Sequence, residues 1–375
     1  MTDKIGIYIH VPFCRSKCYY CDFCSRTRAD EHMLELYTKR LCDDIKNAAL
    51  RLGDRCPQAD TVYFGGGTPT LLSAAQFERI IKTVERNFGI TSEAEMTSEA
   101  NPKTVDEEKL KNMRAIGINR LSIGVQSIHD SELRILGRNH NSGDTLETLS
   151  LARKAGFDNI SVDLMYGIPS QTMESFKKSV KGIVMLAPEH ISSYCLTIED
   201  GTNFGRRRDS LELPDEDTVA DMYADMSEIL QKSGYHKYEI SNFSKEGRES
   251  RHNLKYWRLD DYLGFGPAAH SCFDSVRYAN SRDIDAYLGG EDITESVEKI
   301  EKRERMNEFV MLGMRLADGV CSREFKERFG EELQVEFAAF QKFSPEYVTV
   351  DDMGCRLTDK GMFVSNYILA EVLDI

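Results

Sequence analysis

The 375-residue sequence lacks three features that would each indicate a different class of protein. It has no uninterrupted apolar stretch long enough to span a bilayer, and its start, MTDKIGIYIHVPF, lacks the basic-then-apolar pattern of a signal peptide. We therefore expect a cytoplasmic protein. It also lacks a surplus of positive charge, because 48 basic and 62 acidic residues give a net charge of −14, which opposes general affinity for nucleic acid.

The ten cysteines lack the spacing of a disulfide framework. Cys14, Cys18 and Cys21, here called the cysteine triplet, form a C-x3-C-x2-C pattern after a short apolar run. Because Fe–S clusters are usually held by four thiolates, three thiolates around a [4Fe–4S] cube leave one iron open to an outside ligand. Structural zinc is the alternative, but it typically uses two separated cysteine pairs, and no second pair exists. We expect Cys24 to be a bystander or an occasional substitute.

The first two thirds of the chain alternate short apolar runs with helical stretches, which is typical of a parallel sheet with crossover helices. Six βα units can be counted, and Ser73 with Gln76 predicts a capping box at the start of one helix. The predicted strands are 5–10, 61–64, 95–99, 120–124, 160–164 and 190–196. Six units are too few for a full eight-stranded barrel. In such barrels the chemistry lies at the C-terminal ends of the strands, where the cysteine triplet falls.

The pattern changes after about residue 234. YHKYEISNF predicts one further strand, and we expect a loop to carry RHNLKYW. From residue 298 onward, three helical stretches precede two short strands and a final helix, which is the order of a winged helix. This part is rich in Glu and Asp, so we do not expect it to bind DNA. The predicted units are a barrel at 1–235, a connecting segment at 236–297 and a smaller C-terminal α+β domain at 298–375.

Polar residues occur where the predicted strands end. The glycines of GGGTPT follow the second strand, where they would let a ligand approach the backbone and its N–H groups, although a glycine run alone is usually a tight turn. Four polar side chains also lie at or near the ends of later strands: Glu99, Gln126, Arg138 and Asp163. Each alone has a structural role as its simpler interpretation. Together they supply carboxylates for a ribose or amine, an amide, and a guanidinium that can grip a carboxylate with two hydrogen bonds.

The segments YIHVPFC, CYYCDF, YFGGGTPT, RLSIGVQS, DLMYGIPSQT and YEISNF resemble the oxygen-independent coproporphyrinogen III oxidase-like family of radical S-adenosylmethionine (SAM) proteins. The resemblance covers nearly the whole chain. It implies an α/β fold, a partial (β/α)6 TIM-like barrel with splayed strands. It also implies a [4Fe–4S] cluster whose open iron is chelated by the amino and carboxylate groups of SAM, and a reduced electron donor such as flavodoxin or ferredoxin.

The matching motifs also imply two SAM positions. The cluster-bound SAM would be faced by Tyr8, Gly66 and Glu99. The second position, occupied in the coproporphyrinogen-oxidising members, would be lined by Tyr20, Gly67, Thr68, Gln126, Arg138 and Asp163. The sequence is compatible with either one or two bound SAM molecules.

Three departures from the oxidases favour the haem-chaperone branch of the family. The oxidases carry a fourth cysteine two residues after the triplet, where this chain has Phe23, and a substantial N-terminal extension, whereas only thirteen residues precede Cys14. In addition, SSYCLTIEDGTNFGR and HNLKYW resemble signatures of the chaperone branch. Cys24 departs from both branches.

HNLKYW contains the predicted haem ligand, His252. A lone histidine is usually a hydrogen-bonded structural residue, but haem binding is attributed to this branch and imidazole is the commonest proximal haem ligand. Tyr256 and the only tryptophan, Trp257, could pack on a porphyrin face. Weaker candidates are His10, His140 and His270.

The resemblance therefore predicts a haem chaperone that delivers haem to acceptor apoproteins, with possible peripheral contact with membrane proteins. The alternative is an enzyme, a coproporphyrinogen III dehydrogenase that abstracts hydrogen from propionate side chains and releases carbon dioxide.

Overall fold

A computed structural model describes residues 4–373, and a curved sheet of 12 strands is its main element. The strand order is β14-β13-β12-β11-β1-β4-β5-β6-β7-β8-β10-β9. The parallel strands are β11 (Tyr262–Phe265), β1 (Lys4–Val11), β4 (Gln58–Gly66), β5 (Ile90–Ala100), β6 (Arg120–Gln126), β7 (Ile160–Tyr166) and β8 (His190–Cys195). All six predicted strands are confirmed. The four-residue strand β11 was not predicted.

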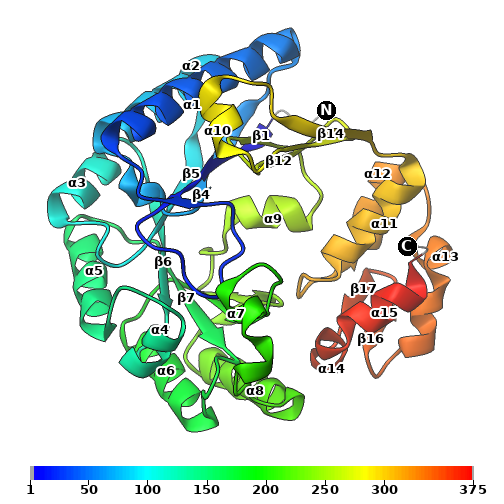
Figure 1. The fold of residues 1–375 in the computed structure, drawn as a ribbon. Helices are drawn as coiled ribbons and strands as arrows, with labels where there is room; N and C mark the ends of the chain where they lie inside the picture. Colours follow the sequence, from blue (N-terminus) through cyan, green and yellow to red (C-terminus); the bar gives the residue numbers. More distant parts are fainter. Residues whose placement is uncertain (1–3, 374–375) are drawn as a thin grey trace.

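Helices cover the outer face of the parallel strands (Figure 1). The longer ones are α1 (Glu31–Leu52), α2 (Ala74–Phe88), α3 (Glu107–Ala115), α5 (Ser142–Lys154), α6 (Met173–Met185) and α8 (Glu216–Lys232). Shorter helices lie in the connections between strands: α4 (Asp130–Ile135), α7 (Asn203–Arg206) and α10 (Ile284–Gly289). The capping box of α2 is confirmed, because Ser73 Oγ accepts from the Gln76 N–H at 3.3 Å and Gln76 Oε1 accepts from the Ser73 N–H at 2.8 Å. Within residues 4–373, no helix is long and apolar enough to cross a membrane.

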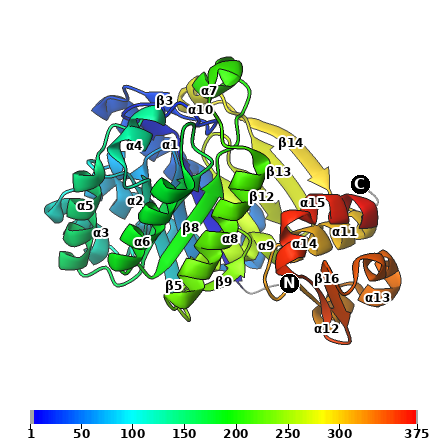
Figure 2. The same ribbon diagram turned by 90° about the horizontal axis from the view of Figure 1, so that it is seen from below.

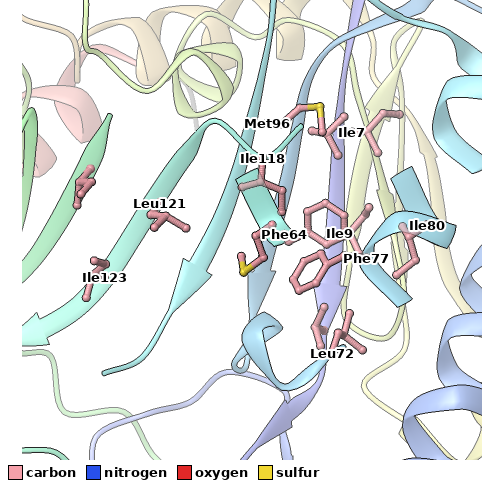
Figure 3. Packing of buried hydrophobic residues seen from close by; sticks show 14 of the residues in the cluster. Ile7, Ile9, Phe64, Leu72, Phe77, Ile80, Met96, Ile118, Leu121 and Ile123 are labelled. Carbon is pink, nitrogen blue, oxygen red and sulfur yellow. The ribbon is translucent and has the colours of Figure 1, made fainter. Parts of the chain in front are cut away.

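The core between the sheet and the helices determines which side chains of each strand face the helices and which face the inside of the barrel. Ile7 and Ile9 of β1 and Phe64 of β4 pack against Phe77 and Ile80 of α2, and all five are fully buried (Figure 3). Burying each such side chain contributes about 1.5–3 kcal/mol. Because side chains alternate along a strand, this packing leaves the intervening residues, such as Tyr8, on the inner face of the sheet.

Antiparallel strands extend both edges of the parallel sheet. Beside β8 lie β10 (Asn242–Ser244) and β9 (His236–Glu239); beside β11 lie β12 (His270–Phe273), β13 (Val276–Asn280) and β14 (Thr294–Lys299). The prediction of a single strand in YHKYEISNF was wrong, because the chain reverses between β9 and β10 and pairs them antiparallel. The loop predicted for RHNLKYW is helix α9 (Arg251–Trp257), capped by Ser250.

The C-terminal part lies beside the barrel in both ribbon views (Figures 1 and 2). Its helices are α11 (Lys302–Gly313), α12 (Ser322–Phe329), α13 (Leu333–Glu336), α14 (Asp359–Phe363) and α15 (Ser365–Val372), and its sheet has the order β15 (Val320–Cys321), β17 (Gly354–Leu357), β16 (Val348–Asp351). It has a separate core that includes Phe309, Phe325 and Phe337. Three helices and then a hairpin were predicted; the winged-helix assignment stays a prediction. Because the strands within 236–297 extend the large sheet, we propose that this segment folds with the barrel.

Candidate functional site

A cavity of about 510 Å³ lies on the inner side of the parallel strands and under the loops at their C-terminal ends. Eleven of the thirteen predicted site residues line it. These are Cys14, Cys18, Tyr20, Cys21, Gly66, Gly67, Thr68, Glu99, Gln126, Arg138 and Asp163. The parallel topology therefore brings residues from five βα units to one place. This is the arrangement predicted from their positions at the C-terminal ends of the strands.

The cysteine triplet lies on the loop that follows β1 and carries the short strands β2 (Phe13–Cys14) and β3 (Arg26–Thr27). Thr68 Oγ1 donates to Cys14 Sγ at 3.6 Å, and Arg138 Nη1 donates to Cys18 Sγ at 3.5 Å. Burial raises the pKa of the Cys14 thiol and raises that of Cys21 to about 11. These thiols are therefore protonated when free, and a bound metal would be needed to hold them as thiolates.

The arrangement of the triplet fits a cluster better than a single ion. Within residues 4–373, no three His, Cys, Asp or Glu side chains converge closely enough to hold one metal ion. A mononuclear zinc site needs such convergence, whereas in an Fe–S cluster each thiolate binds a different iron. Three thiols that line one cavity, with hydrogen-bond donors on two of the sulfurs, fit the second case.

Cys24 lies apart from the triplet. It is buried, its Sγ donates to the Arg282 carbonyl at 3.4 Å, and its own carbonyl accepts from His10 Nε2 at 2.9 Å. It is not among the residues that line the cavity. This placement favours the bystander role over that of a fourth ligand.

The glycine loop after β4 is shaped by packing more than by ligand approach. Gly66 has a φ of +102°, and a Cβ atom there would lie 2.5 Å from the His10 ring; a Cβ on Gly67 would lie 2.6 Å from the Phe13 carbonyl oxygen. The N–H groups of Gly66, Gly67 and Thr68 donate to Glu99, Val11 and Phe13. These three N–H groups are therefore occupied within the protein, contrary to the expectation that they face a ligand.

Two carboxylates in the cavity have raised pKa values. Burial, and then the nearby charge of Asp163, raise the pKa of Glu99 to about 7, even though Tyr63 Oη and the Gly66 N–H donate to it at 3.0 and 3.1 Å. Burial raises the pKa of Asp163 to about 6, and Ser122 Oγ donates to it at 3.2 Å. A buried carboxylate that titrates near neutral pH can either donate to or accept from a polar ligand.

Gln126 and Arg138 hold the end of β6 in an unusual conformation. Gln126 has a φ of +68° at a register shift between β6 and β7, a conformation that few non-glycine residues adopt. Arg138 Nη2 donates to the Gly124 carbonyl at 2.5 Å and to Asn101 Oδ1, while its buried Nε has no hydrogen-bond partner. Local strain of this kind is often found at functional sites.

The remaining two predicted residues, Tyr8 and His252, do not line the cavity. Tyr8 Oη donates to His10 Nδ1 at 3.1 Å, and its ring stacks on Tyr63, which does line the cavity. Tyr8 therefore lies behind Tyr63, which forms part of the cavity wall. Its role beside SAM stays a prediction.

His252 is enclosed within the barrel, which favours a structural role over its predicted role as a haem ligand. Both ring nitrogens have partners at 2.8 Å, Thr61 Oγ1 on Nδ1 and Tyr256 Oη on Nε2, and the ring is stacked on Tyr63. Only 1% of the residue is exposed. In this arrangement both nitrogens are hydrogen-bonded and neither is open to iron, which favours the structural interpretation, and haem ligation by His252 stays a prediction.

The two aromatic residues of HNLKYW contact other protein residues, and their packing on a porphyrin stays a prediction. Tyr256 is bonded to His252, and the Arg315 guanidinium lies 4.6 Å from the centre of the Trp257 ring. Glu95 of β5 accepts from the backbone N–H groups of Arg251 and His252 at 3.1 Å. HNLKYW is therefore a helix that fills the inside of the curved sheet, where Figure 1 shows α9.

Several cavity residues were not predicted. The inner face of β6 carries Arg120 and Ser122, β8 contributes Ser192 and Tyr194, and α9 contributes Asn253. The sequence did contain a signal for the first two: counting back in steps of two from Gln126 gives Gly124, Ser122 and Arg120, which share one face of the strand. No comparable signal marked Asn253, because α9 was read as a loop.

Comparison with known proteins gives consistent matches along the chain. Residues 8–183 match the radical SAM superfamily, and residues 300–364 match the HemN C-terminal domain. "Heme chaperone HemW" of Lactococcus lactis is 33% identical, and that of Bacillus subtilis 34% identical, each over 98% of this chain and over 96% and 98% of those proteins. "Radical S-adenosyl methionine domain-containing protein 1, mitochondrial" of Danio rerio is 32% identical over 99% of this chain and 89% of that protein.

Among solved structures, coproporphyrinogen III oxidase (HemN) from Escherichia coli superposes with a TM-score of 0.86. It is 24% identical, and the match covers 99% of this chain and 90% of that one. This likeness shows that the two chains share a fold.

Proposed function

Since the chain belongs to the HemW family of radical SAM proteins, we propose that it holds a [4Fe–4S] cluster, binds SAM and haem, and hands haem to acceptor apoproteins in the cytoplasm. One observation carries this proposal: the chain is about one third identical, over almost its whole length, to proteins named heme chaperones. The cavity supports it, because it brings the cysteine triplet together with the polar residues that SAM requires.

In this proposal Cys14, Cys18 and Cys21 would hold the cluster, and the chemistry it would supply when bound is one-electron reduction of SAM. Arg138 beside Cys18 would stabilise the negative charge on the cluster side of the cavity. Glu99 and Asp163 would accept hydrogen bonds from hydroxyl or amino groups of SAM, and the proton on Glu99 near neutral pH would limit repulsion between the two carboxylates. Both carboxylates are partly removed from bulk water in the cavity wall, which would strengthen their interactions with the ligand.

The proposed partners are haem-accepting apoproteins, including membrane proteins contacted peripherally, and reduced flavodoxin or ferredoxin as electron donor. The runner-up, a coproporphyrinogen III dehydrogenase, is less well supported. The oxidase likeness is one of fold at 24% identity, and Phe23, which lines the cavity and is 65% exposed, stands where the oxidases carry a cysteine.

The two functions are separated by one experiment on anaerobically reconstituted protein. The protein is given SAM, a reductant and coproporphyrinogen III, and in a parallel sample haem; decarboxylation and the haem absorption spectrum are recorded. We expect a defined Soret band and no decarboxylation. Sustained release of carbon dioxide would contradict the chaperone proposal and favour the dehydrogenase.

A further inference from the structure

Arg120 is a buried cation in the cavity lining, without an ion-pair partner among residues 4–373. It is only 2% exposed and is the largest of the fully buried side chains by volume among the described residues. Across residues 4–373 no carboxylate lies within ion-pair distance of its guanidinium, and its Nε has no hydrogen-bond partner. A buried charge of this kind is costly unless an opposite charge joins it.

Polar residues that line the same cavity as Arg120 offer hydrogen bonds, and none of those described forms an ion pair with it. Asn253 of α9 and Tyr194 of β8 line the same cavity, and Tyr194 is 43% exposed although it sits on the inner face of the sheet. Burial raises the pKa values of Glu99 and Asp163, and the positive charge of Arg120 offsets part of that rise, so its field reaches both carboxylates. Neither carboxylate forms an ion pair with it. A residue that served only as their counter-ion would be expected to touch one of them.

We propose that Arg120 anchors a propionate carboxylate of a tetrapyrrole on the floor of the cavity. This inference rests on the proposed function, which supplies the tetrapyrrole. The planar guanidinium matches a carboxylate through two parallel hydrogen bonds, and Asn253 and Tyr194 can add further donors. Such a carboxylate would neutralise the buried cation and leave Glu99 and Asp163 for SAM.

The residues that line the cavity agree with this ligand. Its walls include apolar surface from Tyr63, Met165 and Phe23, while the charged and amide groups of Arg120 and Asn253 lie among them. A propionate-bearing porphyrin is an apolar ring with flexible acidic side chains, so a propionate can reach a buried cation that the ring itself cannot. The ligand class is therefore a carboxylate-bearing tetrapyrrole.

The test compares haem with haem dimethyl ester, which lacks the free carboxylates. Dissociation constants are measured for the reconstituted wild type, Arg120→Gln, Arg120→Lys and the control Arg153→Gln, whose arginine lies on α5 in an ion pair with Glu189. We expect the wild type and the control to bind haem about ten- to a hundredfold more tightly than the ester, as a charge-assisted hydrogen bond allows. Arg120→Gln should bind haem and ester alike, while Arg120→Lys keeps part of the preference.

Three results would overturn the proposal: a wild type that binds ester as tightly as haem, an Arg120→Gln variant that retains the preference, or a variant that loses SAM affinity in place of haem affinity. The last would assign Arg120 to the carboxylate of SAM. If Arg120→Gln does not fold, the wild-type comparison and Arg120→Lys decide.

The same comparison with iron-free coproporphyrin III and its tetramethyl ester separates this inference from the proposed function. An Arg120-dependent preference for the free acid without haem binding would refute the haem-chaperone proposal and keep the anchor. A wild type that binds neither tetrapyrrole would refute both.

Discussion

His252→Ala should destabilise the protein without changing how it ligates haem. The substitution removes an imidazole that bonds Thr61 Oγ1 and Tyr256 Oη, both at 2.8 Å, in a place where water does not reach. Each buried hydroxyl left without its partner costs about 1–3 kcal/mol, so the free energy of unfolding should fall by roughly 2–6 kcal/mol. Loss of the stacked ring against Tyr63 adds to this, because the space it leaves cannot be filled by alanine.

The assay is denaturant unfolding of wild type and variant, with the Soret band of the haem-loaded folded protein recorded beside it. Tyr256→Phe is the matched control, because it removes one hydroxyl from the same pair and keeps the imidazole. It should lower stability less than His252→Ala. A Soret band that shifts in His252→Ala, together with unchanged stability, would refute the structural role and restore this histidine as a haem ligand.

Three further predictions concern the cavity. Ala in place of any one member of the cysteine triplet should abolish the reconstituted cluster, whereas Cys24→Ala should retain its iron and sulfide; equal loss in Cys24→Ala would indicate a four-thiolate site. Arg138→Ala should reduce SAM affinity about ten- to a hundredfold in equilibrium binding, and because Arg138 donates to Cys18 its cluster spectrum should also change; unchanged affinity would remove it from the site. Glu99 has a folded pKa near 7, above its usual 4.5, so the folded state binds more protons and stability falls as pH rises between these values. Glu99→Gln should reduce this pH-dependent loss of unfolding free energy by up to about 3 kcal/mol. The measurement is the free energy of unfolding of wild type and variant at pH 5 and pH 8. The same pH dependence in both proteins would refute the raised pKa of Glu99.

The barrel could be predicted because its signals are local. β1 reads IGIYIHV, in which alternate residues Ile5, Ile7 and Ile9 are fully buried against the helices. The capping box at Ser73 likewise depends on residues three apart. The edge strands were harder: β9 and β10 are four and three residues long, so a hairpin looked like one continuous strand.

The candidate site was predicted where strand ends decide it and missed where tertiary packing does. Glu99 and Asp163 follow from strand position alone. His252 does not, because whether its nitrogens are free depends on Thr61, which is 191 residues away in the sequence and meets it only after the barrel folds. Arg120 lay within a quoted motif, yet its missing counter-charge is a property of the folded cavity.

Transfer of haem to an acceptor tests the central claim most directly. Haem-loaded, cluster-reconstituted protein is mixed with increasing concentrations of a haem-free b-type cytochrome, and the Soret band of the acceptor is followed over time. Direct hand-over predicts a transfer rate that rises with acceptor concentration. A rate that stays constant at every acceptor concentration would mean that haem simply dissociates into solvent, and it would contradict the assignment of this protein as a haem chaperone.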